Sequence, residues 1–278
     1  MQRWTVPFRE RRKAGASHPV HDFLFVYYQY SPAKLEQWHP GIGVILEQAA
    51  SPSVSEHWFP DAYYSSTGPQ HQDRFCDPSK IDDKTVSRLK WTVELLQRTS
   101  EHRPNFSCLG LHEWAMVYQG HEIRHEKTTP LRLPQQEIDR IVESRPLTCT
   151  HFDAFRFFAQ PAQPLNHHQP TLDDRPSLEQ PACIHANMDL YKWAFKSMPW
   201  IGSELLAECF ELALQARLID MRASPYDVSA FIEDPPIQIE TSAGRATYER
   251  EQRRIFELAQ PLRRRLKERI EFVIMVAS

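Results

Sequence analysis

Glycine is scarce in this chain, which has only 8 glycines against 22 prolines in 278 residues. Neither of the glycine-rich phosphate loops, G-x-G-x-x-G and G-x-x-x-x-G-K-S/T, occurs in the sequence, which excludes nucleotide binding through those motifs. The 5 cysteines are scattered and contain no Cys-x-x-Cys pair. This pattern fits a reducing compartment and argues against a zinc site made of thiolates.

Long apolar runs are also missing. The sequence has no stretch of about 18 apolar residues, so we expect no contact with a membrane. The charged N-terminus is not followed by the apolar segment of a signal peptide. We therefore expect a soluble, cytoplasmic protein.

The sequence has no excess of positive charge, since its formal net charge is −3. It therefore has no general attraction for a polyanion, and contact with duplex DNA would need a local basic patch. Two patches are candidates, residues 9–13 and residues 263–269. The alternative is a frayed terminus for the first and a solvated helical face for the second.

Helical patterns dominate what is present. Apolar residues at helical spacing predict helices over residues 82–98, 185–197, 203–221 and about 245–275, and Pro261 should kink or divide the last one. Residues 109–118 fit either a helix or a buried strand. Residues 121–133 and 138–149 are interrupted by prolines and predict a small sheet, and residues 236–240 alternate as a short strand does.

We therefore expect a fold that is mainly α with a minor β component (α+β), in which a helical C-terminal half surrounds a buried polar site. A hydrophobic content of 41% is enough for a substantial core, so residues 1–278 can form a single domain. The proline-rich connection over residues 160–181 is a possible internal boundary.

Five short stretches concentrate His, Asp and Glu beside bulky apolar residues. They cover residues 110–114, 151–156, 185–189, 220–222 and 224–227. Burying such groups costs several kcal/mol unless they are paired, hydrogen-bonded or bound to a metal. The five polar stretches together predict one shared pocket.

His185 and Asp189 are four residues apart, on one face of a predicted helix. They can reach a common metal ion or each other, as a base and its orienting carboxylate. The alternative is that the stripe they share with Lys192 and Lys196 faces water. His112 and Glu113 lie in apolar surroundings, where burial favours the neutral form of Glu113 that a general acid requires. A structural histidine is the alternative at His112.

His151 and Asp153 have the i, i+2 spacing that places two ligands on one side of an extended strand. The competing interpretation is a capping box between Thr150 and Asp153. Ser224, followed by a proline and then by Asp227, is typical of a helix start. That interpretation gives Asp227 a structural role. For Asp220 and Arg222, a functional role and a structural role both remain open.

Several of these stretches resemble an uncharacterised bacterial family whose members often carry the name 3-methyladenine DNA glycosylase. The resemblance covers most of the chain, in residues 18–25, 38–41, 110–118, 151–158, 179–181, 185–193 and 220–227. The family name implies excision of alkylated bases from DNA. Residues 39–44 look like the hairpin of helix-hairpin-helix glycosylases, whose backbone amides bind a DNA phosphate. In that superfamily a catalytic aspartate follows the hairpin, and Asp61 lies near the corresponding distance. The alternative is an ordinary turn.

Two enzymatic hypotheses and one structural hypothesis follow. The first is a DNA-base N-glycosylase without a cofactor, in which the base flips into an aromatic pocket and a carboxylate assists cleavage. The second is a hydrolase or oxidoreductase that uses iron, zinc or manganese on a small-molecule substrate. The third is a non-enzymatic helical scaffold.

The candidate residues fall into three groups. The catalytic candidates are Glu113, Asp153, His185, Asp189 and Asp220. The substrate-binding candidates are Tyr27, Trp114, Arg156, Asn187 and Arg222. The candidate metal ligands under the second hypothesis are His112, His151, Asp153, His185 and Asp189.

Overall fold

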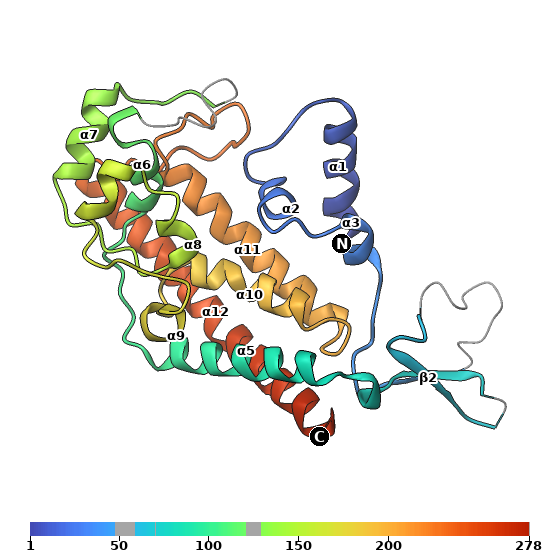
Figure 1. Cartoon of the computed structure of the whole chain (residues 1–278). Helices are drawn as coiled ribbons and strands as arrows, with labels where there is room; N and C mark the ends of the chain where they lie inside the picture. The colour runs from blue at the N-terminus through green and yellow to red at the C-terminus, as the bar shows by residue number, and fades with distance from the viewer. Residues whose placement is uncertain (48–58, 70, 121–128, 278) are drawn as a thin grey trace.

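The computed structural model describes residues 1–47, 59–69, 71–120 and 129–277. It is mainly helical, with one small sheet that projects to the side of the helices (Figure 1). The expected fold class is therefore confirmed. Four long helices form its centre: α5 (Asp83–Glu101), α10 (Ile184–Lys196), α11 (Ser203–Ala223) and α12 (Ser242–Ala277).

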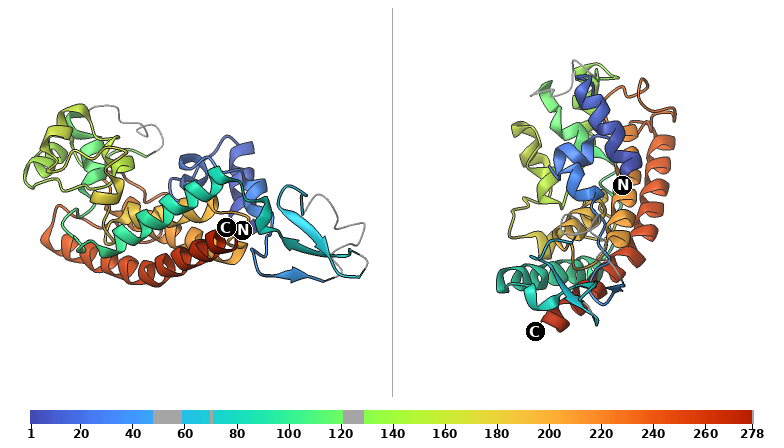
Figure 2. Two further views of the ribbon diagram at one scale, coloured as in Figure 1. Left: turned by 60° about the horizontal axis from the view of Figure 1, so that its bottom comes forward. Right: turned by 90° about the vertical axis from the view of Figure 1, so that its right-hand side faces the viewer.

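These four helices form where the apolar periodicity predicts them. In α5, the Asp82 side chain accepts the Thr85 amide at the N-terminus, and Leu89 and Leu96 are buried on one face. α10 packs along α11, and α12 packs against α5, α10 and α11. α12 continues through Pro261, so the expected division is wrong, and it curves around the other helices (Figure 2).

Three helices lie at the N-terminus: α1 (Gln2–Lys13), α2 (Phe23–Tyr27) and α3 (Pro32–Glu36). Of these, α2 packs on α11 and α1 packs on α3. The Phe8 ring stacks on Phe25 at 4.6 Å, and Phe25 packs on Phe210 at 5.5 Å between ring centroids. Arg11 forms an ion pair with Asp22. Residues 9–13 therefore belong to a packed helix, and the alternative of a frayed terminus is wrong.

The sheet has three antiparallel strands in the order β1-β3-β2, with β1 at Ile45–Leu46, β2 at Tyr64–Thr67 and β3 at Asp73–Cys76. The expected position of the sheet is wrong. Residues 129–149 contain the helix α7 (Gln135–Glu143), whose buried Ile138 and Val142 have helical spacing. Residues 121–128 of that expectation lie outside the described residues.

Short helical elements connect the long helices: η1 (Pro78–Lys80), α6 (Leu111–Met116), η2 (Tyr118–Gly120), α8 (Phe152–Phe155), η3 (Gln160–Leu165) and α9 (Arg175–Leu178). The segment over residues 109–118 is thus a helix where it could have been a strand. The proline-rich connection contains η3 and α9, and one apolar cluster includes residues on both sides of it. Among the described residues, no helix is both long and apolar enough to cross a membrane.

Two further local expectations are wrong. Residues 236–240 form no strand; Ile237 and Ile239 are buried, and the Ile237 amide donates to the Arg222 carbonyl. Ser224 ends α11, where its hydroxyl donates to the Met221 carbonyl at 2.8 Å, and no helix begins at this residue. A proline after a serine can follow a helix as well as begin one, because it cannot continue the preceding helix.

Candidate functional site

Four of the five polar stretches meet in the interior of the helical half. His112 and Glu113 come from α6, His151 and Asp153 from the start of α8, His185 and Asp189 from α10, and Asp220 from α11. The expected shared polar site is therefore present. Asp227, from the fifth stretch, is exposed and accepts the Ser229 amide instead.

The site consists of two adjacent clusters. The histidine cluster comprises His112, Glu113, His185, Arg217 and Asp220. The ion-pair cluster comprises His151, Asp153, Arg175, Glu179, Asp189 and Lys192. The rings of His151 and His185 connect the two, with 5.5 Å between their centroids.

In the histidine cluster, three buried side chains from three helices converge. The Nε2 atom of His112 lies 2.7 Å from Oδ1 of Asp220, and the rings of His112 and His185 lie edge to face at 4.6 Å. One potential ligand atom from each of His112, His185 and Asp220 lies within 4.8 Å of the others. Arg217 Nη1 donates to both Glu113 and Asp220, at 2.8 Å in each case.

Burial and charge shift the pKa values of this cluster. Burial lowers the pKa of His112, but the Asp220 carboxylate raises it by more, so this pKa lies well above its ordinary value. Burial and the charge of His112 lower the pKa of His185 to about 3. Burial and the Asp220 charge raise the pKa of Glu113, which agrees with the expectation that its neutral form is favoured. The cluster thus holds one histidine that favours its charged form beside one that favours its neutral form.

His185 and Asp189 do not form the expected pair, because they belong to different clusters. His185 faces His112 and Asp220, whereas Asp189 faces His151 and the ion-pair cluster. Both side chains are buried, so the alternative of a water-facing stripe is wrong for these two residues. One turn of α10 is enough to direct the two groups to separate partners.

The ion-pair cluster is saturated with hydrogen-bond donors. Tyr28 Oη donates a hydrogen bond to Oδ1 of Asp189 at 2.7 Å, and Arg175 Nη2 donates one to Oδ2 of Asp189 at 2.6 Å. Lys192 Nζ donates to Oδ2 of both Asp153 and Asp189, at 2.8 and 3.2 Å. Burial raises the pKa of Asp189, but Lys192, His151 and Arg175 together lower it well below its ordinary value. Asp189 is therefore a stable buried carboxylate.

His151 lies against two carboxylates of this cluster. Its Nε2 atom is 3.4 Å from Asp189 Oδ2 and 3.5 Å from Glu179 Oε1. The capping box between Thr150 and Asp153 is not formed; the helix has no side-chain cap, and Asp153 binds Lys192. The expected strand is also wrong, because His151 precedes a short helix.

A pocket of about 850 Å³ opens beside both clusters. Five of the candidate residues line it, namely Tyr27, Glu113, Asp153, Arg156 and His185. The rings of Phe23 and Tyr27 stack in its wall at 5.0 Å and 12°. His112, His151, Asp189 and Asp220 do not line the pocket and lie among the buried residues. The pocket therefore gives access to Glu113, Asp153 and His185 of the two clusters.

Three substrate-binding candidates lie outside the pocket lining. The Trp114 indole is buried and donates to the Ala223 carbonyl at 2.8 Å. Asn187 is buried, and its side chain accepts Arg263 and donates to Pro181. Arg222 donates to the Pro235 carbonyl at 3.0 Å. The contacts of these side chains hold neighbouring segments of the protein together.

The features expected to bind DNA have other contacts. The Ile42 amide donates to the Trp200 carbonyl at 2.9 Å, and β1, rather than a helix, follows residues 39–44. The interpretation of this segment as a DNA-binding hairpin is therefore wrong. Asp61 is exposed beside Arg74 and does not line the pocket.

The second basic patch is not a purely solvated face. Arg263 is buried against Asn187, and Arg265 pairs with Glu208. Arg269 donates to backbone carbonyls, including that of Ile201 at 3.3 Å. Much of the charge of this patch is thus engaged by the protein itself.

Several side chains of the two clusters are not among the site residues predicted from the sequence. Arg217 lies in a strongly apolar part of α11, three residues before Asp220, and this isolation was a signal that the two pair. Arg175 and Glu179 have the i, i+4 spacing of a helical ion pair. Lys192 was expected on the water-facing stripe of the alternative interpretation, and not in a buried cluster.

The assembled site can bind a ligand beside a buried set of two imidazoles and a carboxylate. It also holds a buried carboxyl group, Glu113, at the edge of the same pocket. Such groups can ligate a metal ion, transfer protons or orient a substrate. No family model, curated protein or solved structure matches the chain.

Proposed function

We propose that the protein is a metal-dependent enzyme that acts on a small molecule, with the metal held by His112, His185 and Asp220. The observation that carries the proposal is the convergence of three potential ligand atoms within 4.8 Å, from three different helices. Two imidazoles and one carboxylate are a ligand set for iron, zinc or manganese. Three protein ligands also leave coordination positions for a substrate or water.

The charges and hydrogen bonds of the two clusters favour this location. His185 is buried and lines the pocket, so its imidazole lies where an ion that enters from the pocket can bind. In the ion-pair cluster, Arg175 and Lys192 already bind the carboxylates. A divalent ion there would be repelled by the charges of Arg175 and Lys192. In the histidine cluster the permanent cation is Arg217, and a metal ion would replace the proton of His112.

The surrounding residues suit a reaction at this position. A bound divalent ion supplies a Lewis acid and lowers the pKa of a bound water. Glu113 lines the pocket beside Arg217 and can exchange a proton with the substrate. His185 also lines the pocket, so the ligand set is directly next to the bound molecule. Whether the reaction is hydrolytic or oxidative depends on the metal.

Metal analysis tests the proposal. Protein purified without chelator, and then supplied with Fe²⁺, Zn²⁺ or Mn²⁺, should bind about one ion per chain. His185→Ala and Asp220→Asn should each lower the affinity at least about tenfold, since each removes a ligand. His71→Ala, at an exposed histidine, is the matched control and should bind like the wild type. Lack of near-stoichiometric metal after purification and after addition would overturn the proposal.

A second candidate is a DNA-base N-glycosylase, which one observation favours. The stacked rings of Phe23 and Tyr27 line the same pocket as the carboxyl groups of Glu113 and Asp153. A flipped base stacks on aromatic rings, and a carboxylate can assist cleavage of its glycosidic bond. This reaction needs no metal and fits a cytoplasmic protein.

Base excision distinguishes this candidate from the metal-dependent enzyme. The assay uses duplex DNA that contains alkylated bases, and it is run in the presence of chelator. Excision that persists in chelator and is lost in Asp153→Asn would favour the glycosylase. Absence of excision by the wild-type protein would remove this candidate.

A further inference from the structure

Arg217 is a buried cation with an unused hydrogen-bond donor. Its bonds to Glu113 and Asp220 both use Nη1. Its Nε atom is buried and has no hydrogen-bond partner among the described residues. Buried guanidinium donors are normally satisfied, so this one calls for an acceptor beyond the described residues. Because Arg217 lines the pocket, a ligand is the natural source of that acceptor.

The charge of the histidine cluster also calls for an anion. The cluster contains the carboxylates of Glu113 and Asp220 and the guanidinium of Arg217. A divalent ion at the proposed metal site, with neutral imidazoles, leaves one surplus positive charge when Glu113 is ionised and two when it is protonated. Unbalanced charge in a buried site is unfavourable, and in either case a ligand with one negative charge reduces the imbalance.

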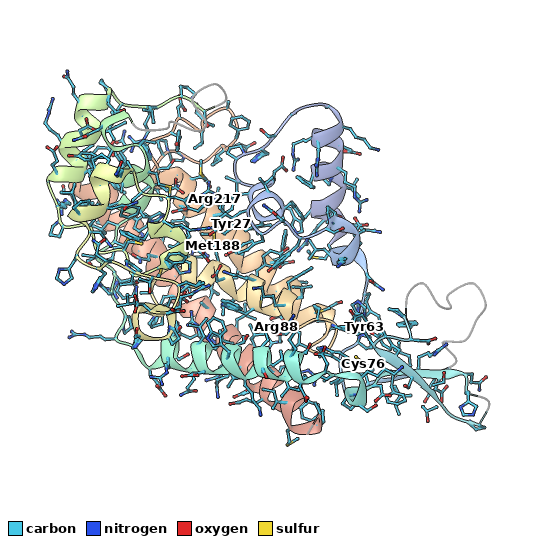
Figure 3. All side chains as sticks on the ribbon, in the orientation of Figure 1. Tyr27, Tyr63, Cys76, Arg88, Met188 and Arg217 are labelled. Atoms are coloured by element: carbon cyan, nitrogen blue, oxygen red, sulfur yellow. The ribbon has the colours of Figure 1, made fainter. Side chains whose placement is uncertain are left out.

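The rest of the pocket wall has an apolar and aromatic part beside polar side chains that include Asp22, Gln29, Gln160 and Gln163. Phe23 packs against the Arg217 guanidinium at 3.7 Å, and its ring stacks with Tyr27. Tyr27 of α2 and Arg217 of α11 lie close together in Figure 3. Further apolar and aromatic lining residues are Met116, Phe157, Phe158, Met221, Tyr226 and Phe231. This part of the wall can hold an apolar body.

Arg156 is the other arginine of the pocket, and it differs from Arg217 in its exposure. Its side chain is 47% exposed, whereas that of Arg217 is 7% exposed. A charge that is partly in water gains little from an added ion pair. Arg217, which is buried, is therefore the stronger anchor for an anion.

From these observations we propose that the pocket binds a small carboxylic acid with an apolar body, whose carboxylate pairs with Arg217. A planar carboxylate matches the hydrogen-bonding geometry of a guanidinium edge. The inference rests on the proposed function, because it names the substrate class of the same site. Nevertheless, it is tested by binding alone and needs no turnover.

Benzoate serves as the probe, measured by calorimetry with metal-loaded and with chelator-treated protein. We expect benzoate to bind the metal-loaded protein at least about tenfold more tightly than benzamide or benzyl alcohol, which keep the ring but lack the charge. Arg217→Lys keeps the positive charge but loses the planar fork, so it should weaken benzoate binding about tenfold. Arg156→Lys tests the competing anchor and should weaken binding less than Arg217→Lys does. Arg253→Lys, at an arginine that packs on Phe106 outside the pocket lining, is the matched control and should change the affinity less than about twofold.

The outcomes separate the two proposals. Metal binding without any preference for benzoate over the neutral analogues overturns the carboxylate pocket and leaves the metal site intact. Preferential benzoate binding without any metal binding overturns the metal site and leaves the carboxylate pocket intact. Equal loss in Arg217→Lys and Arg156→Lys would overturn the assignment of Arg217 as the anchor. Thermal unfolding of each variant verifies that the fold is intact, and the analogue series on wild-type protein decides the matter if Arg217→Lys does not fold.

Discussion

Replacing Asp189 by asparagine should strongly destabilise the protein. The carboxylate is buried, and it accepts hydrogen bonds from Tyr28, Arg175 and Lys192 at 2.7, 2.6 and 3.2 Å. An asparagine keeps the size of the side chain and one oxygen acceptor. It removes the negative charge that balances two buried cations, and its amide nitrogen cannot accept their protons.

The expected loss is about 4 kcal/mol of unfolding free energy, since removing one partner of a buried ion pair typically costs about 3–5 kcal/mol. An unfolding entropy of about 2.1 cal/mol/K per residue converts this loss into a Tm decrease of about 7 °C for a chain of this size. Lys192→Met should recover part of the loss when it is combined with Asp189→Asn, because it removes one of the unbalanced cations.

Urea titration followed by circular dichroism measures the effect. The transition midpoint should fall at an unchanged slope, which shows that stability rather than compactness has changed. Asp227→Asn is the matched control at an exposed aspartate, where the loss should stay below about 1 kcal/mol. The reasoning is refuted if Asp189→Asn costs no more than this control, because the ion-pair cluster would then contribute no measurable stability.

Three other perturbations have definite expected results. Burial lowers the pKa of His39 to about 4, so the folded state resists protonation of this residue. Stability is therefore lost as the pH falls below about 6.5, the ordinary pKa of histidine. Between pH 7 and pH 5, the unfolding free energy of the wild type should fall about 2 kcal/mol more than that of His39→Asn. Gly244→Ala would place Cβ 1.8 Å from the Gln238 carbonyl oxygen. Its Tm should therefore fall clearly below that of Gly15→Ala, where nothing lies within 4 Å and the cost is that of the left-handed φ of +68° alone. Trp114→Phe leaves the Ala223 carbonyl without its indole donor, so calorimetry should show a stability loss of about 1–3 kcal/mol and unchanged benzoate affinity; a large change in affinity alone would restore Trp114 as a ligand contact.

The long helices could be predicted because their signals are local. Leu89 and Leu96 of α5 lie on one face of a single helix, and this spacing is visible without knowledge of any partner. The sheet could not be located in the same way. The prolines near residues 121–149 favour an extended segment in the sequence, whereas in the structure Pro134 precedes α7 and Pro146 follows it. A proline excludes the helix interior but does not tell whether the flanking segment is helix or strand.

By itself, the sequence determined that His, Asp and Glu occur in apolar surroundings, and therefore that these groups need partners in the interior. Only the tertiary structure decided which partners they have. His112 meets Asp220 across 108 residues of chain, and Arg217 meets Glu113 across 104. His185 and Asp189, only four residues apart, separate into two clusters. Helical spacing fixes the direction of each side chain on its own helix, but the packing of α6, α8, α9 and α11 around α10 fixes what each side chain meets.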